Sequence, residues 1–274
     1  MQARLQRRVQ RYGWDRAAPY YDDFWSEALA PATAGLLRLA ALRPAERVLD
    51  VACGTGALSL AAARAVGARG SVLGTDISEK MIDEALGAAA ALGYSHCRFE
   101  RRDAEEIAAA GPAFDAVLCG LGLMYVPDPE RAIRLMTARL APGGRLLASV
   151  WGRRERCGWA GVFPVIDARV ESDVCPLFFR LGSGNALQGA FESSGLHDVV
   201  AERIACQLSY PSGDRACDAA LLGGPVALAY ARFDAAAKDA VRAEYLRSIE
   251  TFRRGDGYEI PGEFVIARGK KIRV

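Results

Sequence analysis

The chain has 274 residues, of which 51% are hydrophobic and 25% are charged, a composition typical of a globular protein and unlike that of a disordered one. Its 35 lysines and arginines against 33 aspartates and glutamates leave a net charge of +2, too balanced for a protein that mainly binds nucleic acid. The longest uncharged apolar run, 219–231, has 13 residues, whereas a membrane span needs about 20. We therefore predict neither a nucleic-acid partner nor a membrane span.

The first 45 residues are predicted to be helical, with Pro31 and Pro44 bracketing a helix over 32–42. Residues 1–16 carry five arginines and one aspartate, which favours a solvated leading helix over an arm that grips nucleic acid or membrane. From residue 46, short β-type runs alternate with helical runs. The predicted strands are 47–51, 71–75, 97–102, 114–119 and 144–150, and the predicted helices are 57–66, 79–92 and 129–140. Such alternation predicts βαβ units and a parallel sheet.

The pattern is less regular after Trp151. The predictions there are short helices within 152–196, a strand over 198–208, helices over 213–222, 225–231 and 234–253, and a last strand over 258–268. The chain is thus predicted to be an α/β protein with a seven-stranded, mostly parallel sheet and helices on both faces. Its three parts would be a helical lid (1–45), a sheet core (46–151) and a segment (152–274) that completes the sheet and adds a helical cap.

The cysteine pattern points to a reducing compartment. The seven cysteines are Cys53, Cys97, Cys119, Cys157, Cys175, Cys206 and Cys217. Their odd number, wide spacing and lack of a CxxC pair favour neither a disulfide framework nor a zinc or other metal site. Because the start of the chain also lacks the apolar run of a signal peptide, we expect a cytoplasmic protein.

A glycine-rich turn follows the first predicted strand, in the segment VLDVACGTG (48–56). Such a turn lets backbone approach a ligand closely, and the helix that follows offers free N–H groups. Alone, it is also compatible with a tight strand-to-helix connection.

Acidic residues at strand ends narrow the choice of ligand. Asp76 closes the second strand, 20 residues after Gly56, where it can accept both ribose hydroxyls of a nucleoside, and Asp103 closes the third, where it can accept from an adenine amino group. Asp50, at the end of the first strand, would repel a pyrophosphate and attract an ammonium group. Ser59 stands where a dinucleotide site would favour a third glycine. These residues favour S-adenosylmethionine (SAM) over NAD.

With these residues, the sequence resembles class I SAM-dependent methyltransferases and, among them, the C-methyltransferase-like group of ubiquinone and menaquinone biosynthesis. The matching segments are VLDVACGTG (48–56), GTDIS (74–78), RRDAEEI (101–107), FDAVLCGLGLMYVPDPERA (114–132) and LAPGGRLLASVW (140–151). One departure is Ala52, where many relatives have the first glycine of the loop. The resemblance implies a Rossmann-like core that binds SAM and releases S-adenosylhomocysteine.

The resemblance also implies roles for individual residues. Asp50 and the loop would surround the methionine part of SAM, Asp76 the ribose and Asp103 the adenine. The implied cofactor-binding residues are Tyr21, Asp50, Ala52, Cys53, Gly54, Gly56, Asp76, Ile77, Met81, Asp103, Ala104, Cys119 and Gly120. Tyr20 and Tyr21 match an aromatic cap of the cofactor, with ordinary packing as the alternative.

The chemistry requires alignment more than acid–base groups, because SAM already carries an activated methyl group. His96 and His197 both precede their strands, so we expect them at the edge opposite the cofactor. No catalytic residue is identified; the candidates are Tyr210, Tyr125 and Tyr20. Trp159 and three phenylalanines, Phe163, Phe178 and Phe179, are expected to roof the acceptor.

The acceptor is thus predicted to be a small, largely apolar molecule, aromatic or quinone-like. A homodimer stays an open alternative. Two other functions stay open. One is a nicotinamide-dependent oxidoreductase, against which Asp50 speaks. The other is a SAM-binding protein without turnover, because acceptor residues vary freely.

Overall fold

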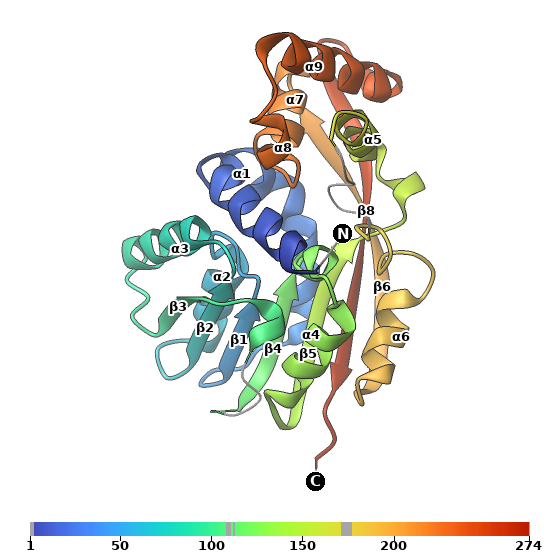
Figure 1. Ribbon diagram of the computed structural model, residues 1–274. Coiled ribbons are helices and arrows are strands. Elements are labelled where there is room, and N and C mark those ends of the chain that lie inside the picture. The colour runs from blue at the N-terminus through green and yellow to red at the C-terminus, as the bar shows by residue number, and fades with distance from the viewer. Residues whose placement is uncertain (1–2, 108–110, 112, 171–176, 274) are drawn as a thin grey trace.

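The computed structural model (Figure 1) describes residues 3–107, 111, 113–170 and 177–273. Cys175 and part of the helical segment predicted within 152–196 lie outside the described residues. The strands are β1 (Arg47–Val51), β2 (Ser71–Asp76), β3 (Cys97–Arg101), β4 (Phe114–Gly120), β5 (Leu140–Trp151), β6 (His197–Tyr210), β7 (Arg253–Arg254) and β8 (Gly257–Lys270).

The sheet has the order β3-β2-β1-β4-β5-β8-β6, with the two-residue β7 paired to β8 off this path. The first five strands pair in parallel, and β8 runs antiparallel to both β5 and β6. The predicted α/β fold with a mostly parallel sheet is confirmed. The short β7 was not predicted, and β5 begins at Leu140, four residues before the predicted strand.

Helices cover both faces of the sheet. The α-helices are α1 (Ala3–Ala40), α2 (Ala57–Val66), α3 (Glu79–Ala91), α4 (Pro129–Ala138), α5 (Val162–Asp167), α6 (Ala186–Ser193), α7 (Gly213–Leu221), α8 (Ala227–Tyr230) and α9 (Ala235–Ile249). Short 3₁₀ turns are η1 (Ala104–Glu106), η2 (Leu123–Tyr125), η3 (Arg154–Arg156), η4 (Gly158–Gly161) and η5 (Glu250–Phe252). Apolar residues of α2, α3 and the end of α1 pack on one face, and those of α4 and α6 on the other. Within the described residues, no helix combines the length and apolarity needed to span a membrane.

The first helix runs without interruption through Pro19 and Pro31, so the predicted helix start after Pro31 was wrong. A proline inside a helix removes one hydrogen bond and costs about 3 kcal/mol. Burial on both sides of Pro31 offsets that cost, because Trp25, Ala32 and Leu36 are all buried in the core. The result is one continuous helix from Ala3 to Ala40, just before the first strand.

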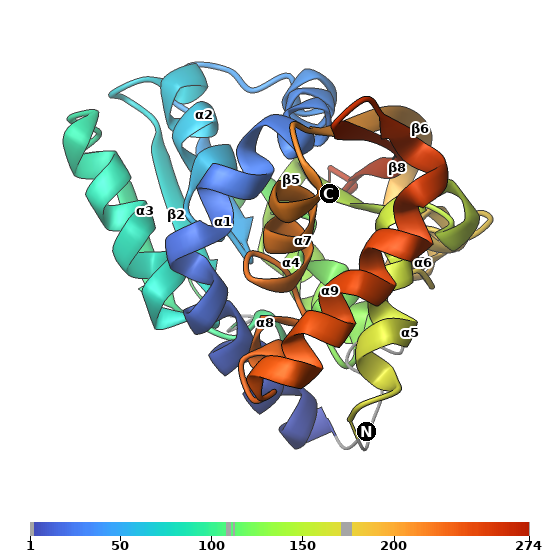
Figure 2. The same cartoon turned by 90° about the horizontal axis from the view of Figure 1, so that it is seen from above.

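A group of helices, α7, α8 and α9, lies around the far end of β6 and β8, beyond the other strands (Figure 1). Seen from above, α1 passes between α3 on one side and α7 and α8 on the other (Figure 2). One hydrophobic cluster includes Trp25 of α1, Leu146 of β5 and Tyr245 of α9. The first helix and the late helices therefore share the core of the sheet.

Candidate functional site

The ends of the parallel strands and the first half of α1 enclose a cavity of about 710 Å³, including its open mouth. Parallel sheets place such crevices at the carboxyl ends of their strands. Its lining residues are Arg7, Gln10, Trp14, Tyr21, Ala52, Gly54, Asp76, Ile77, Met81, Arg102, Asp103, Ala104, Gly120, Leu121, Gly122, Tyr125, Val126 and Pro127. The loops after β1, β2, β3 and β4 all contribute.

The loop after β1 has left-handed backbone at three positions, Ala52 (φ 56°), Gly54 (φ 55°) and Gly56 (φ 91°). A side chain on Gly54 would meet no other atom within 4 Å, because this residue faces the cavity. Ala52 adopts the same conformation at a cost of about 1–2 kcal/mol. The loop thus exposes backbone, not side chains, to a ligand.

Asp76 connects the two loops that flank the cavity. Its Oδ2 accepts a hydrogen bond from the Gly54 N–H at 3.0 Å, and its Oδ1 accepts one from the Ser78 N–H at 2.9 Å. Burial raises the pKa of Asp76 to about 6, against the lowering effect of these two bonds. Each oxygen keeps a lone pair, so the carboxylate can accept two further hydrogen bonds from ligand hydroxyls.

Asp103 and two apolar side chains form the end of the cavity that lies at β2 and β3. The Oδ1 of Asp103 accepts from the Glu105 N–H at 2.8 Å, while its Oδ2 lies 3.2 Å from the Nε of Arg7. Ile77 and Met81 also line this end. A flat heterocycle with a hydrogen-bond donor suits such a surface, because apolar side chains cover its face and a carboxylate its edge.

Four side chains of α1 hold this helix across the carboxyl edge of the sheet, each on a different loop. The contacts join Asp22 Oδ1 to Thr55 Oγ1 at 2.6 Å, Asp15 Oδ1 to Ser78 Oγ at 2.7 Å, Arg7 Nε to Asp103 Oδ2 at 3.2 Å, and Gln6 Nε2 to the Tyr125 carbonyl at 3.3 Å. The loops after β1, β2, β3 and β4 are therefore all tied to one helix.

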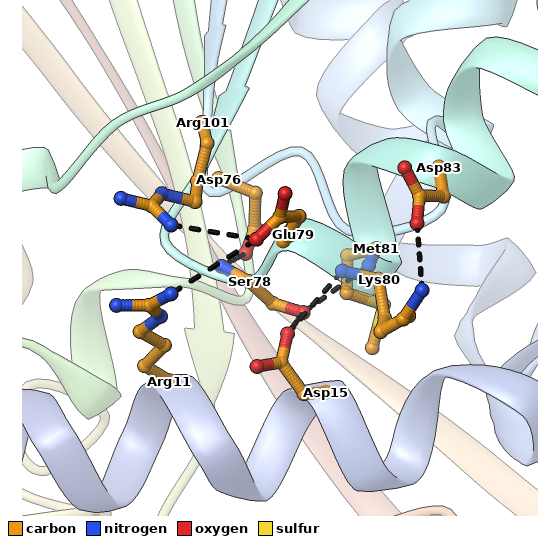
Figure 3. Close-up of polar contacts among 9 residues, drawn as sticks. All are labelled: Arg11, Asp15, Asp76, Ser78, Glu79, Lys80, Met81, Asp83 and Arg101. Carbon is orange, nitrogen blue, oxygen red and sulfur yellow. Dashed lines mark hydrogen bonds and ion pairs between the residues drawn. The ribbon is translucent and has the colours of Figure 1, made fainter.

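Figure 3 shows the contact at the start of α3 in detail. Asp15 reaches the hydroxyl of Ser78, which caps α3 by accepting from the Met81 N–H at 3.1 Å. Arg11, also drawn in Figure 3, has its Nη2 atom 4.0 Å from Oε2 of Glu79. Ser78 therefore both caps α3 and anchors α1.

A family profile described as a methyltransferase domain matches residues 42–157. This stretch contains β1 to β5 and the four loops that line the cavity. Residues 42–157 are thus similar to a methyltransferase domain. Over 111 residues the chain is 35% identical to a demethylmenaquinone methyltransferase of Bacillus cytotoxicus. The aligned residues make up 40% of this chain and 47% of that protein. The chain thus matches about half the length of that relative.

Solved structures resemble a larger part of the chain than residues 42–157 alone. The YcgJ protein of Bacillus subtilis superimposes with a TM-score of 0.63 at 18% identity, over 89% of this chain and 100% of that one. The Haemonchus contortus phosphoethanolamine N-methyltransferase 2, in complex with S-adenosyl-L-methionine, gives 0.59 at 15% identity, over 94% of this chain and 57% of that one. At these identities the likeness concerns the fold.

Some of the predicted cofactor-binding residues lie behind the loop after β1 and do not line the cavity. Asp50 is fully buried, and its Oδ2 accepts from the Ser59 hydroxyl of α2 at 2.6 Å. Its Oδ1 has no hydrogen-bond partner among the described residues, and burial raises its pKa to about 7. Cys53, Gly56 and Cys119 likewise lie beside the cavity without lining it. Asp50 thus lies under the loop and does not line the cavity, and its contact with an ammonium group stays a prediction.

The three tyrosines proposed for catalysis lie in different places. Tyr125 lines the cavity, with Trp14 at a ring distance of 5.0 Å. Tyr20 is 45% exposed on the outer side of α1, and its neighbour Tyr21 lines the cavity instead. Tyr210 is not among the cavity residues, because β6 continues past the other strands and pairs Tyr210 with Tyr258.

Both histidines lie away from the cavity, as predicted. His96 Nε2 lies 3.0 Å from the Ala63 carbonyl oxygen. His197 begins β6 and pairs with Lys270, at the amino end of the parallel strands. Neither histidine is placed to act on a ligand in the cavity.

Eight cavity residues were missed at the sequence level, and three of them, Arg7, Gln10 and Trp14, lie on α1. Together with Tyr21 they recur at intervals of three, four and seven residues, which puts them on one helix face. That stripe of polar and aromatic residues was a usable signal. The arginine excess of 1–16 instead favoured a solvated helix, whereas Arg7 is paired with Asp103 and Glu105.

We expect the Asp50→Asn variant to change how stability depends on pH. Burial raises the pKa of Asp50 in the folded protein to about 7, above the ordinary aspartate value of 3.8. The folded state therefore binds an extra proton, and wild-type stability falls as pH rises from about 4 to about 7. Because asparagine does not titrate in this pH range, the variant should not show this fall in stability. Urea denaturation without ligand should show the variant more stable than wild type by ~1–4 kcal/mol at pH 8, with the difference shrinking toward pH 4. The exposed Asp239→Asn is the control, and equal pH slopes for Asp50→Asn and wild type would contradict the assignment.

Proposed function

We propose that the protein is a SAM-dependent methyltransferase that acts on a small, largely apolar acceptor. The observation that carries the proposal is the pairing of a ligand-facing glycine loop with the Asp76 carboxylate, which spans Gly54 and Ser78. The methyltransferase domain match and the demethylmenaquinone methyltransferase relative support it.

The residues at the cavity fit SAM part by part. The open space over Gly54 suits the methionine portion, because a side chain there would meet no protein atom. Asp76 would accept the ribose hydroxyls, Ile77 and Met81 would cover the adenine, and Asp103 would accept from its amino group. Ala52, Ala104, Gly120 and Tyr21 would complete the wall, while Asp50, Cys53, Gly56 and Cys119 would hold the loops in place.

When bound, SAM supplies an activated methyl group. The chain's task is then to align an acceptor and exclude water, without a dedicated strong base. Tyr125 lines the cavity, and burial keeps the pKa of Tyr21 far above neutral, so Tyr21 stays a neutral phenol. An acceptor that needs little help in losing its proton, such as a phenol or a reduced quinone, suits this wall.

Calorimetric titration with SAM, S-adenosylhomocysteine and NAD tests the cofactor. We expect the first two to bind and NAD not to, because Asp50 lies under the loop that a pyrophosphate would approach. Binding of NAD alone would replace the proposal by an oxidoreductase. A panel of phenols and reduced quinones, scored by S-adenosylhomocysteine release, then tests turnover. SAM binding with no release from any acceptor would favour a binding protein without turnover.

A further inference from the structure

A second, smaller cavity of about 340 Å³ lies next to the first and shares four residues with it, Trp14, Tyr21, Leu121 and Tyr125. Three tryptophans also line it, Trp25 of α1, Trp151 of β5 and Trp159 of η4. We call this space the aromatic chamber. The link between α7 and α8, at 223–225, also lines it. Since Leu121 follows β4 directly, the chamber adjoins the first cavity at the end of β4.

The three tryptophans form one packed group. Ring centroids are 6.3 Å apart for Trp25 and Trp151, 6.2 Å for Trp25 and Trp159, and 4.9 Å for Trp151 and Trp159. The predicted roof phenylalanines are not among the chamber residues, and Phe163 and Phe178 pack behind Trp159 at 5.8 and 5.6 Å. None of the described residues that line the chamber is charged. It therefore suits a flat apolar ring.

Two polar atoms of the chamber residues lack partners. The Nε1 atoms of Trp25 and Trp159 are buried and have no hydrogen-bond partner among the described residues, and the residues are 6% and 3% exposed. An indole N–H can only donate. Trp14 differs, because its Nε1 donates to Gln10 Oε1 at 3.1 Å. Both tryptophans line the chamber, so a ligand there that brings oxygen acceptors would offer partners for these two donors.

We infer that the aromatic chamber binds the methyl acceptor, and that Trp25 and Trp159 select a flat aromatic ring bearing carbonyl or hydroxyl oxygens. This inference rests on the proposed function. A quaternary ammonium ligand is the competing class, because aromatic walls also attract cations. The two N–H groups oppose it, since both present positive hydrogens and the lining residues supply no carboxylate.

The test compares 1-naphthol with naphthalene, which has the same rings and no oxygen, and with phenyltrimethylammonium. Each is titrated without cofactor, by tryptophan fluorescence and calorimetry, into wild type, Trp25→Phe, Trp159→Phe and Trp14→Phe. We expect Trp25→Phe and Trp159→Phe to weaken the binding of 1-naphthol about three- to tenfold more than the binding of naphthalene. This difference is the effect of one lost hydrogen bond. Trp14→Phe, whose N–H already has a partner, should weaken both probes equally.

Gly223→Ala offers a test that keeps all indoles. A Cβ on Gly223 would lie 3.2 Å from Trp25 Nε1, so its methyl group should hinder an oxygen at that donor and weaken 1-naphthol more than naphthalene. Equal losses for both probes in all variants, or tighter binding of phenyltrimethylammonium than of 1-naphthol, would overturn the inference. S-adenosylhomocysteine is titrated separately. Its binding without selective naphthol binding refutes the chamber alone, and its failure to bind refutes the proposed function.

Discussion

Replacing Asp76 by alanine is expected to lower SAM affinity by roughly 10- to 100-fold. The change removes the acceptor for two ribose hydroxyls in a site where Asp76 is 7% exposed, and leaving buried donors unpaired costs about 1–3 kcal/mol. It also frees the N–H groups of Gly54 and Ser78, which hold the two loops in register. Calorimetric titration of the folded variant measures the loss.

Two further variants make the Asp76 result specific. Asp76→Asn keeps one oxygen acceptor and should give an intermediate loss. Asp83→Ala removes an exposed carboxylate of α3 that pairs with Lys80 at 3.0 Å, so it should bind SAM as wild type does. An unchanged dissociation constant for Asp76→Ala, with its circular dichroism spectrum intact, would remove Asp76 from the cofactor site.

Replacing Gly122 by alanine is expected to destabilise the loops of the site by ~1–3 kcal/mol, the usual cost of overpacking. A Cβ on Gly122 would lie 2.4 Å from the Cβ of Ala52 and 3.0 Å from Cys119 Sγ. The backbone of Gly122 is ordinary (φ −97°), so the clash alone sets the cost. SAM affinity should fall as well, because both loops line the cavity.

A compensating change separates this clash from general damage. Ala52→Gly removes the opposing Cβ and relieves a left-handed alanine, so the double variant Ala52→Gly, Gly122→Ala should recover most of the lost stability. Urea denaturation of the four proteins gives the coupling energy. Gly87→Ala, where a Cβ meets no atom within 4 Å, is the control and should be neutral or stabilising. Additive effects at Ala52 and Gly122 would show that these side chains do not meet.

The sheet and its glycine loop were predictable because their signals are local. Strand and helix runs alternate, and acids such as Asp76 end strands that a parallel sheet brings to one edge. The contacts of α1 were not predictable in this way, since Asp22 and Thr55 are 33 residues apart and Arg7 and Glu105 are 98 apart. No periodicity within one segment reports such pairs.

Two predicted site residues are not among those that line the cavity, for reasons of geometry. Tyr210 was expected near the ligand because it follows a strand, but β6 spans 14 residues and carries it past the cavity. Asp50 was expected to face the ligand because it nears a strand end, but its side chain turns toward Ser59 of α2. In both cases the strand was predicted correctly, and its length or side-chain direction decided the outcome.

The first helix is continuous over 38 residues, and both cavities include its side chains. Arg7 and Gln10 line the first, Trp25 lines the aromatic chamber, and Trp14 and Tyr21 line both. A molecule that binds in one cavity and stabilises the position of this helix is therefore expected to favour binding in the other cavity. Thermodynamic linkage makes this reciprocal: the factor by which cofactor raises acceptor affinity equals the factor by which acceptor raises cofactor affinity.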